Sequence, residues 1–308
     1  MLKLSAGLLI TTVAMAAALA AAATPASAQR HFPTVDVAVE ALVAASRDNS
    51  ESRLLAILGT EGRELIRSGD AVADRTGRER FVAAYDEEHR TELNGEDQAL
   101  LIVGKEQWPM PIPLIREANG WRFDTQAGKE EILNRRIGRN ELKVIEVCRA
   151  YVQAQREYAM LKIGGQSAYA RQFKSSPGQH DGLYWPVKSG DPESPFGPLV
   201  AEAHASGYTD HPGAPSRTTS HAFHGYYFRI LTAQGASAAG GARSYLVAGR
   251  MTGGFALIAY PATYGDSGVM TFIVNQNGIV FEKNFGPETA RLARAITEYN
   301  PDASWHVP

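Results

Sequence analysis

Histidine is the residue type in this chain best suited to binding a metal or moving a proton near neutral pH. His221 and His224 lie close together, with His204 and His211 upstream. A catalytic zinc site usually takes three protein ligands in a defined geometry. His221 and His224 would point to different faces of an extended segment, and no helical spacing pairs them. The pattern therefore predicts no bound metal, and only His224 is retained as a candidate for ligand binding.

A second set of candidates occupies neighbouring positions of one predicted helix. Tyr85, Glu88 and His89 combine an aromatic ring, a carboxylate and an imidazole. If they line a cavity, these groups could hold a ligand or transfer a proton. The alternative is an ordinary helix that buries Tyr85 and leaves its acidic residues in solvent. The two interpretations differ in burial, because perturbed groups in a pocket are typical of functional sites.

A third set of candidates lies in a loop-rich region with the sequence HDGLYWP, which contains His180, Tyr184 and Trp185. Exposed Tyr and Trp side chains are common recognition anchors. The same side chains can equally pin a loop onto its own domain, because buried aromatic rings contribute strongly to core packing. Both interpretations stay open from the sequence.

Other patterns that support catalysis are missing from the sequence. Residues 216–220 are rich in hydroxyl groups but lack the G-x-S-x-G elbow of a serine hydrolase. Cys148 is the single cysteine, so no disulfide forms within the chain, and its apolar neighbours predict a buried thiol. No cofactor is expected, because the paired glycines lack the strand–loop–helix context of a phosphate-binding loop.

The first residues have the three parts of a bacterial signal peptide. Lys3 provides the positive start, residues 8–23 are apolar, and Ala26-Ser27-Ala28 matches the cleavage rule. The apolar run is short for a membrane span of about 20 residues, and the cleavage site follows directly. We expect cleavage after Ala28, a periplasmic or secreted protein, and no stable membrane insertion after cleavage.

The overall charge argues against a nucleic-acid partner. The chain has 31 Lys and Arg residues against 33 Asp and Glu residues, a formal net charge of −2, and removal of Lys3 makes the balance one unit more negative. Binding to nucleic acid needs clustered excess Lys and Arg. The expected partner is a small molecule or an envelope protein.

The N-terminal half predicts helices followed by a curved antiparallel sheet. Thr34 is a plausible N-cap for the first helix, and a later helix is predicted from about Arg78 to Leu93. Three strands follow, at residues 98–103, 110–117 and 120–124. We predict one α+β domain over residues 29–137.

The C-terminal half predicts a long helix packed on an antiparallel sheet. Helical spacing runs over residues 130–158 with an interruption near 138–140, and its apolar stripe contains Leu142, Ile145, Cys148 and Val152. A long loop is predicted over residues 164–220. Three strands that pair in sequence order are predicted between Gly253 and Gly286, and the first should be covered on both faces or lie at an edge. The predicted fold class is α+β, with a second domain over residues 138–308.

Two stretches resemble known folds. Helices that precede a sheet ending in NGWRFDT resemble the nuclear-transport-factor-2-like cone fold over residues 32–136. The helix IEVCRAYVQAQREYA, followed by HGYYFRI and FALIAYPATYGDSGVMTFIVNQNGIVF, resembles a type IV pilin or pseudopilin head. Pilins polymerise through an uncleaved N-terminal helix, whereas here a cleaved signal and another domain come first. The second resemblance therefore implies a fold and not a filament.

The mature chain as a whole resembles a family of uncharacterised bacterial secreted proteins, a domain-of-unknown-function family. The matching stretches include FPTVDVAVEALVAA, FVAAYDEEHR, GWRFDTQAGKEEILNRRIGRNEL and HGYYFRILTAQG. This resemblance implies no known activity or substrate. The favoured hypothesis is a non-catalytic binding or envelope-assembly and maintenance protein. The alternative hypothesis is a small-molecule enzyme that uses a cavity around Tyr85, Glu88 and His89.

Overall fold

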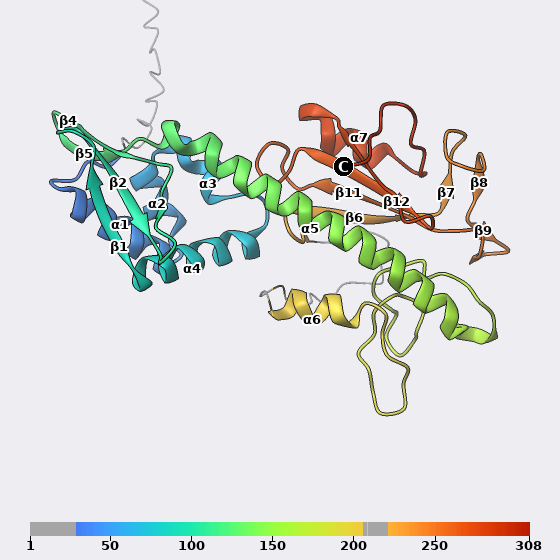
Figure 1. Ribbon diagram of the computed structural model, residues 1–308. Coiled ribbons are helices and arrows are strands. Elements are labelled where there is room, and N and C mark those ends of the chain that lie inside the picture. The colour runs from blue at the N-terminus through green and yellow to red at the C-terminus, as the bar shows by residue number, and fades with distance from the viewer. Residues whose placement is uncertain (1–28, 206–207, 209–220) are drawn as a thin grey trace, which may run out of the picture.

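The protein consists of two lobes joined by one long helix, as the computed structural model shows (Figure 1). The structure describes residues 29–205, 208 and 221–308, so the predicted signal peptide and His211 lie outside the described residues. The joining helix is α5, Thr125–Leu161. We call residues 29–124 the N-terminal lobe and residues 166–308 the C-terminal lobe. None of the helices described is both long and apolar enough to cross a membrane.

The N-terminal lobe packs helices against an antiparallel sheet. Its helices are α1 (Val35–Arg47), α2 (Glu51–Leu58), α3 (Arg63–Ile66) and α4 (Ala71–Glu87), with a 3₁₀ turn at Thr60–Gly62. Its strands are β1 (His89–Leu93), β2 (Gln98–Val103), β3 (Trp108–Pro109), β4 (Leu114–Glu117) and β5 (Gly120–Phe123). The strand order is β1-β2-β4-β5, and β3 pairs with β2. The α+β class predicted from the sequence is therefore confirmed.

Two predicted boundaries in this lobe are wrong. The helix predicted to reach Leu93 ends at Glu87, and residues 89–93 form β1, which pairs along its whole length with β2. The strand predicted from residue 110 starts only at Leu114. Pro111 and Pro113 explain the late start, because proline has no N–H to donate to a strand ladder.

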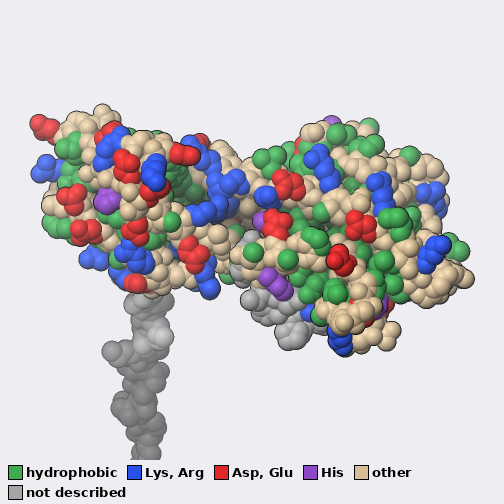
Figure 2. All heavy atoms as spheres, turned by 60° about the horizontal axis from the view of Figure 1, so that its bottom comes forward, with side chains coloured by type: hydrophobic (Ala, Val, Ile, Leu, Met, Phe, Trp, Pro, Cys, Tyr) green, Lys and Arg blue, Asp and Glu red, His purple; other side chains and the backbone are tan. Residues whose placement is uncertain are grey.

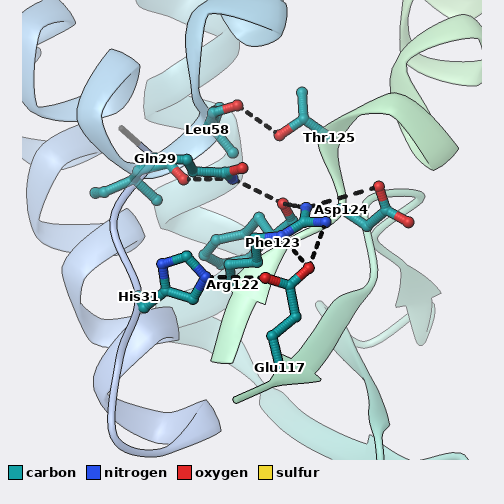
Figure 3. Close-up of polar contacts among 9 residues, drawn as sticks. Gln29, His31, Leu58, Glu117, Arg122, Phe123, Asp124 and Thr125 are labelled. Atoms are coloured by element: carbon teal, nitrogen blue, oxygen red, sulfur yellow. Dashed lines mark hydrogen bonds and ion pairs between the residues drawn. The ribbon is translucent and has the colours of Figure 1, made fainter. Parts of the chain in front are cut away.

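The start of the described chain is fixed to the N-terminal lobe (Figure 3). The side-chain amide of Gln29 donates to the carbonyl oxygens of Ile57 and Phe123, at 2.9 and 2.7 Å. Phe32 is buried, and its backbone forms an antiparallel bridge with Trp121. The segment that follows the predicted cleavage site is thus part of the folded lobe.

Helix α5 is continuous through residues 138–140, where an interruption was predicted. A side chain at Gly138 would contact nothing within 4 Å, so this glycine faces open space and carries only the intrinsic helix cost of about 1 kcal/mol. The hydrophobic core of the N-terminal lobe includes Ile132, and that of the C-terminal lobe begins at Val144. The predicted domain boundary after residue 137 falls between Ile132 and Val144 on α5.

The predicted apolar stripe of α5 is partly wrong. Cys148 and Val152 are buried against the sheet of the C-terminal lobe, and Ile145 is half-buried there. Leu142 is 66% exposed, whereas Val144 is fully buried. The stripe therefore passes through Val144, and Leu142 lies outside it.

The C-terminal lobe contains a four-stranded antiparallel sheet. Its strands are β6 (Tyr226–Leu231), β11 (Ala256–Pro261), β12 (Met270–Asn275) and β13 (Val280–Asn284), in the order β13-β12-β11-β6. The last three strands of the chain thus pair in sequence order, as predicted. Smaller elements are β7 (Ala233–Gln234), β8 (Arg243–Ser244), β9 (Leu246–Val247) and β10 (Arg250–Met251).

Helices cover both faces of this sheet. The hydroxyl of Tyr226 on β6 reaches Glu141 of α5, whereas Arg229, three residues along, donates to carbonyl oxygens at the end of α7 (Thr289–Ala295). All residues of β11 are buried, as predicted for a strand covered on both faces. Part of the predicted loop at residues 164–220 is helical, because α6 spans Gly197–Ala205.

Candidate functional site

The three candidates of the N-terminal lobe lie where α4 passes into β1. Tyr85 is half-buried, and its ring stacks on that of His89 with the centroids 3.7 Å apart. Partial burial, together with nearby acidic groups, raises the pKa of the Tyr85 hydroxyl. Glu88 is exposed and accepts a hydrogen bond from Gln107 at 2.8 Å. Glu88 is therefore not the desolvated partner of His89 that would favour the enzyme hypothesis.

The aromatic residues of the HDGLYWP motif fasten their loop to α5. Trp185 is buried, and its indole N–H donates to the carbonyl oxygen of Pro192 at 3.0 Å. Its ring contacts those of Tyr158 and His180, and the Tyr158 hydroxyl donates to the His180 carbonyl oxygen at 2.8 Å. Tyr184 is half-buried beside the same core. This geometry favours loop pinning over recognition by exposed rings.

His224 lies at the junction of the two lobes, away from the other candidates. Its backbone N–H donates to the hydroxyl of Tyr208 at 3.1 Å, and burial lowers the pKa of its imidazole. Its φ of +50° is in the left-handed region, which is unusual for a residue with a side chain. Within the described ranges, no group of three His, Cys, Asp or Glu residues is placed to hold a metal ion.

A groove of about 340 Å³ in the C-terminal lobe was not predicted from the sequence. It lies between strand β13, the segment that follows α7 and the C-terminal tail. Its lining residues are Ile273, Lys283, Phe285, Ala295, Ile296, Thr297, Glu298, Asn300 and Trp305. Its volume is at the lower end of the range typical of small-molecule sites.

One wall of the groove combines two aromatic rings with a cation. The rings of Phe285 and Trp305 meet edge to face with the centroids 5.6 Å apart. The ammonium group of Lys283 lies 5.1 Å from the first centroid and 5.9 Å from the second. Lys283 also donates to the hydroxyl of Ser304 at 2.6 Å. The rings hold this cation at the groove, where it can meet an acidic ligand group.

Other lining residues of the groove are polar. Glu298 is exposed, and the side-chain oxygen of Asn300 accepts a hydrogen bond from the backbone N–H of Ser237 at 2.8 Å. The C-terminal tail is held against β13, because Glu282 and His306 exchange backbone hydrogen bonds at 2.7 and 3.0 Å. Backbone pairing therefore holds the tail that carries Trp305, and a hydrogen bond holds Asn300 at the rim.

The sequence carries only a weak signal for this groove. Lys283 and Phe285 are two residues apart, so a strand would place them on one face. Trp305 lies 20 residues further along, in a tail that shows no periodic pattern. The contact between Lys283 and Trp305 depends on the pairing of the tail with β13, and no local sequence motif predicts that pairing.

The fold and the groove define a two-lobed α+β protein with a ligand-sized depression in its C-terminal lobe. The chain belongs to the family described as "Protein of unknown function (DUF2950)", whose model matches residues 29–307. No curated protein and no solved structure matches the chain. The resemblances to the cone fold and to pilin heads accordingly rest on sequence patterns alone.

Proposed function

We propose that this protein is exported and acts in the cell envelope by binding a small ligand, without catalysing a reaction. The observation that carries this proposal is the groove, where Lys283 stands over the rings of Phe285 and Trp305. Apolar surface with a few fixed polar groups is typical of ligand sites. If the ligand is a component of the cell envelope, its binding would give the protein a role in envelope assembly or maintenance.

The chemistry of the groove favours a small acidic molecule with an apolar body. Ile296, Phe285 and Trp305 provide apolar surface for that body. Lys283 provides a positive charge, and its partner Ser304 is a neutral hydroxyl. At the rim, the carboxylate of Glu298 can accept hydrogen bonds from donor groups of the ligand, and the side-chain amide of Asn300 can donate to acceptor groups.

The export part of the proposal has separate support. The family match begins at residue 29, directly after the predicted cleavage site, and Gln29 is hydrogen-bonded into the N-terminal lobe. N-terminal sequencing of the protein from the producing cell should find Gln29 as the first residue. Intact Met1 on membrane-embedded protein would contradict the export proposal.

Ligand binding can be tested with anilinonaphthalene sulfonate, a fluorescent anion with an apolar body. The mature protein should bind this probe saturably at one site. Lys283→Gln should weaken binding about tenfold, because it removes one charge-assisted contact. Lys188→Gln is the matched control, because Lys188 is an exposed lysine that is not part of the groove.

The proposal fails if Lys283→Gln and Lys188→Gln bind the probe as the unchanged protein does. Native mass spectrometry of protein purified from the envelope then addresses the natural ligand. A bound small molecule should be retained by the control variant and lost from Lys283→Gln.

A further inference from the structure

The sheet of the N-terminal lobe has one covered edge and one open edge. Its strand order is β1-β2-β4-β5, so β1 and β5 are the outer strands. The start of the described chain covers β5, because Phe32 and Trp121 exchange backbone hydrogen bonds at 2.8 Å. On the other side, all residues of β1 are exposed. In the described ranges, β2 is the only segment that pairs with β1.

Alternate residues of β1 direct their backbone groups toward β2. In an antiparallel pair of strands, hydrogen-bonded and non-hydrogen-bonded residue pairs alternate along the ladder. Directly after β1, the N–H of Asn94 donates to the carbonyl oxygen of Gln98 at 2.9 Å, so these two residues form a hydrogen-bonded pair. Counting back by two residues each time, Glu92 and Arg90 are also bonded to β2.

The intervening residues of β1 turn their backbone N–H and C=O groups toward the open edge. Thr91 lies opposite Leu101 on β2. The carbonyl oxygen of Leu101 accepts the N–H of Met110 at 2.8 Å, so the backbone of Leu101 faces away from β1. By the same alternation, His89 and Leu93 direct their backbone groups outward with those of Thr91. The open edge therefore presents a regular row of donors and acceptors.

The order of the side chains along β1 is self-complementary. If two copies of β1 pair antiparallel about a two-fold axis at Thr91, Arg90 of each copy lies opposite Glu92 of the other. Within one chain Arg90 already pairs with Glu92 at 2.7 Å, so the two-fold arrangement joins two such pairs into one network of alternating charge. Figure 2 shows acidic and basic side chains interspersed over the visible face of the N-terminal lobe, a composition that suits contact between two identical surfaces.

The same axis aligns the backbone groups of the open edge. Thr91 lies opposite Thr91 of the second copy, and His89 lies opposite Leu93, so all the outward N–H and C=O groups meet a partner. Leu93, which is 68% exposed, would be covered by the second copy. A two-fold axis at Arg90 or at Glu92 would instead set like charges opposite one another, which is destabilising.

We infer that β1 is a dimerisation edge, which pairs antiparallel with β1 of a second copy of this chain about a two-fold axis at Thr91. An unpaired outer strand is a template for another strand, and proteins that avoid such pairing use proline, bulges or a covering segment. Strand β1 has no proline and pairs with β2 without a bulge. A contact between two short strands buries little surface, so we expect the dimer to dissociate on dilution. The edge is separate from the groove of the C-terminal lobe, so either proposal can fail alone.

The test reverses the charges on β1 of the mature protein, and sedimentation velocity over a wide concentration range measures dimerisation. Arg90→Glu and Glu92→Arg each set like charges opposite one another in the dimer, so each variant should dimerise at least about tenfold more weakly than the unchanged protein. An equimolar mixture of the two variants should form a heterodimer, because opposite charges then face each other again. Arg291→Glu and Glu288→Arg are the matched controls, because they reverse an exposed ion pair on the C-terminal lobe.

Amide hydrogen exchange tests the register of the pairing. The N–H groups of Thr91 and Leu93 should exchange slowly at concentrations where the protein is a dimer and rapidly after dilution. Those of Arg90 and Glu92 bond to β2 in either state, so their exchange should change much less.

Three results would overturn the inference. The unchanged protein could stay a monomer at every concentration, which would leave a strand of a different protein as the occupant of the edge. The variants Arg90→Glu and Glu92→Arg could dimerise as the controls do, which would place any dimer interface elsewhere. Their mixture could stay monomeric although each variant melts as the unchanged protein does, which would exclude this register.

Discussion

The carboxylate of Asp70 and the hydroxyl of Tyr208 meet at 2.7 Å across the junction between the two lobes. The same carboxylate oxygen accepts the backbone N–H of Gly225 at 2.8 Å. Its other oxygen accepts the N–H groups of Val72 and Ala73 and so caps α4. One buried side chain therefore both starts a helix of the N-terminal lobe and joins it to the C-terminal lobe.

Replacing Asp70 with Ala should destabilise the protein strongly. The change leaves several buried donors without an acceptor, which should lower the free energy of unfolding by about 3 kcal/mol. Tyr208→Phe removes one hydroxyl, which donates to Asp70 and accepts from the backbone N–H of His224, and should cost about 1–2 kcal/mol. Urea denaturation of both variants and of the double variant measures the coupling. Strictly additive effects would show that the hydrogen bond between the two residues contributes nothing.

Gly225 and Gly278 form a matched pair of glycine positions. Both have left-handed φ values, of +76° and +81°. A Cβ at Gly225 would lie 2.6 Å from the side-chain nitrogen of Asn140 and 2.9 Å from Cβ of Ser267, whereas one at Gly278 meets nothing closer than 3.9 Å. Gly278→Ala should cost about 1 kcal/mol from backbone strain. Gly225→Ala should cost about 3 kcal/mol, because crowding adds to the strain. Equal melting temperatures of the two variants would contradict this reasoning.

Asp266 should make stability depend on pH. Burial and the charge of Glu64 raise the pKa of its carboxyl from 3.8 to about 6, and Asp74 adds to the rise, against the opposing charges of Arg136 and Lys129. Because the folded-state pKa is raised, the protonated form is favoured in the folded protein. The stabilisation by the protonated carboxyl is complete below the pKa that Asp266 has in the unfolded chain. This stabilisation is lost as the pH rises through about 6.

The variant Asp266→Asn isolates this contribution, because Asn stays neutral. Asp266 is partly exposed, so solvent screening reduces the effect to about 1 kcal/mol. The variant should match the unchanged protein near pH 4 and exceed its unfolding free energy by about 1 kcal/mol near pH 7.5. Urea denaturation at several pH values measures the difference. A difference that stays constant over this pH range would argue against the assignment.

Val144 and Leu142 offer a test of how α5 packs. Val144 is fully buried in the core of the C-terminal lobe, and Leu142 is 66% exposed. Val144→Asp should lower the free energy of unfolding by about 4 kcal/mol, because it buries a charge without a partner. Leu142→Asp should change it by less than about 0.5 kcal/mol. Similar costs for both changes would mean that α5 does not bury Val144 in preference to Leu142.

Local patterns in the sequence were enough to predict three of the four strands in the sheet of the C-terminal lobe. Residues 256–261 are apolar on both faces, and they form the interior strand β11. Asn277-Gly278 lies in the turn between β12 and β13, where Gly278 has a positive φ. Alternation and turn residues act over a few positions, so they are visible in the chain itself.

Features that depend on packing were not predictable in the same way. The helical pattern around Tyr85 continues into residues 89–93, yet those residues pair with β2 and become a strand. Leu142 fits the apolar spacing of α5, but the register of the helix on the sheet buries Val144 instead. The spacing of apolar residues shows that a helix or strand has a buried face. The packing of that element against its neighbours decides which residues lie on the buried face.

The sequence by itself determined the α+β class, the family and the strands of the closing meander. Only the tertiary structure decided where polar groups meet. Asp70 and Tyr208 are 138 residues apart, and Lys283 reaches Trp305 because the tail pairs with β13. The patterns that predict helices and strands extend over a few neighbouring residues, whereas such contacts arise when separate elements bury their apolar surfaces against one another.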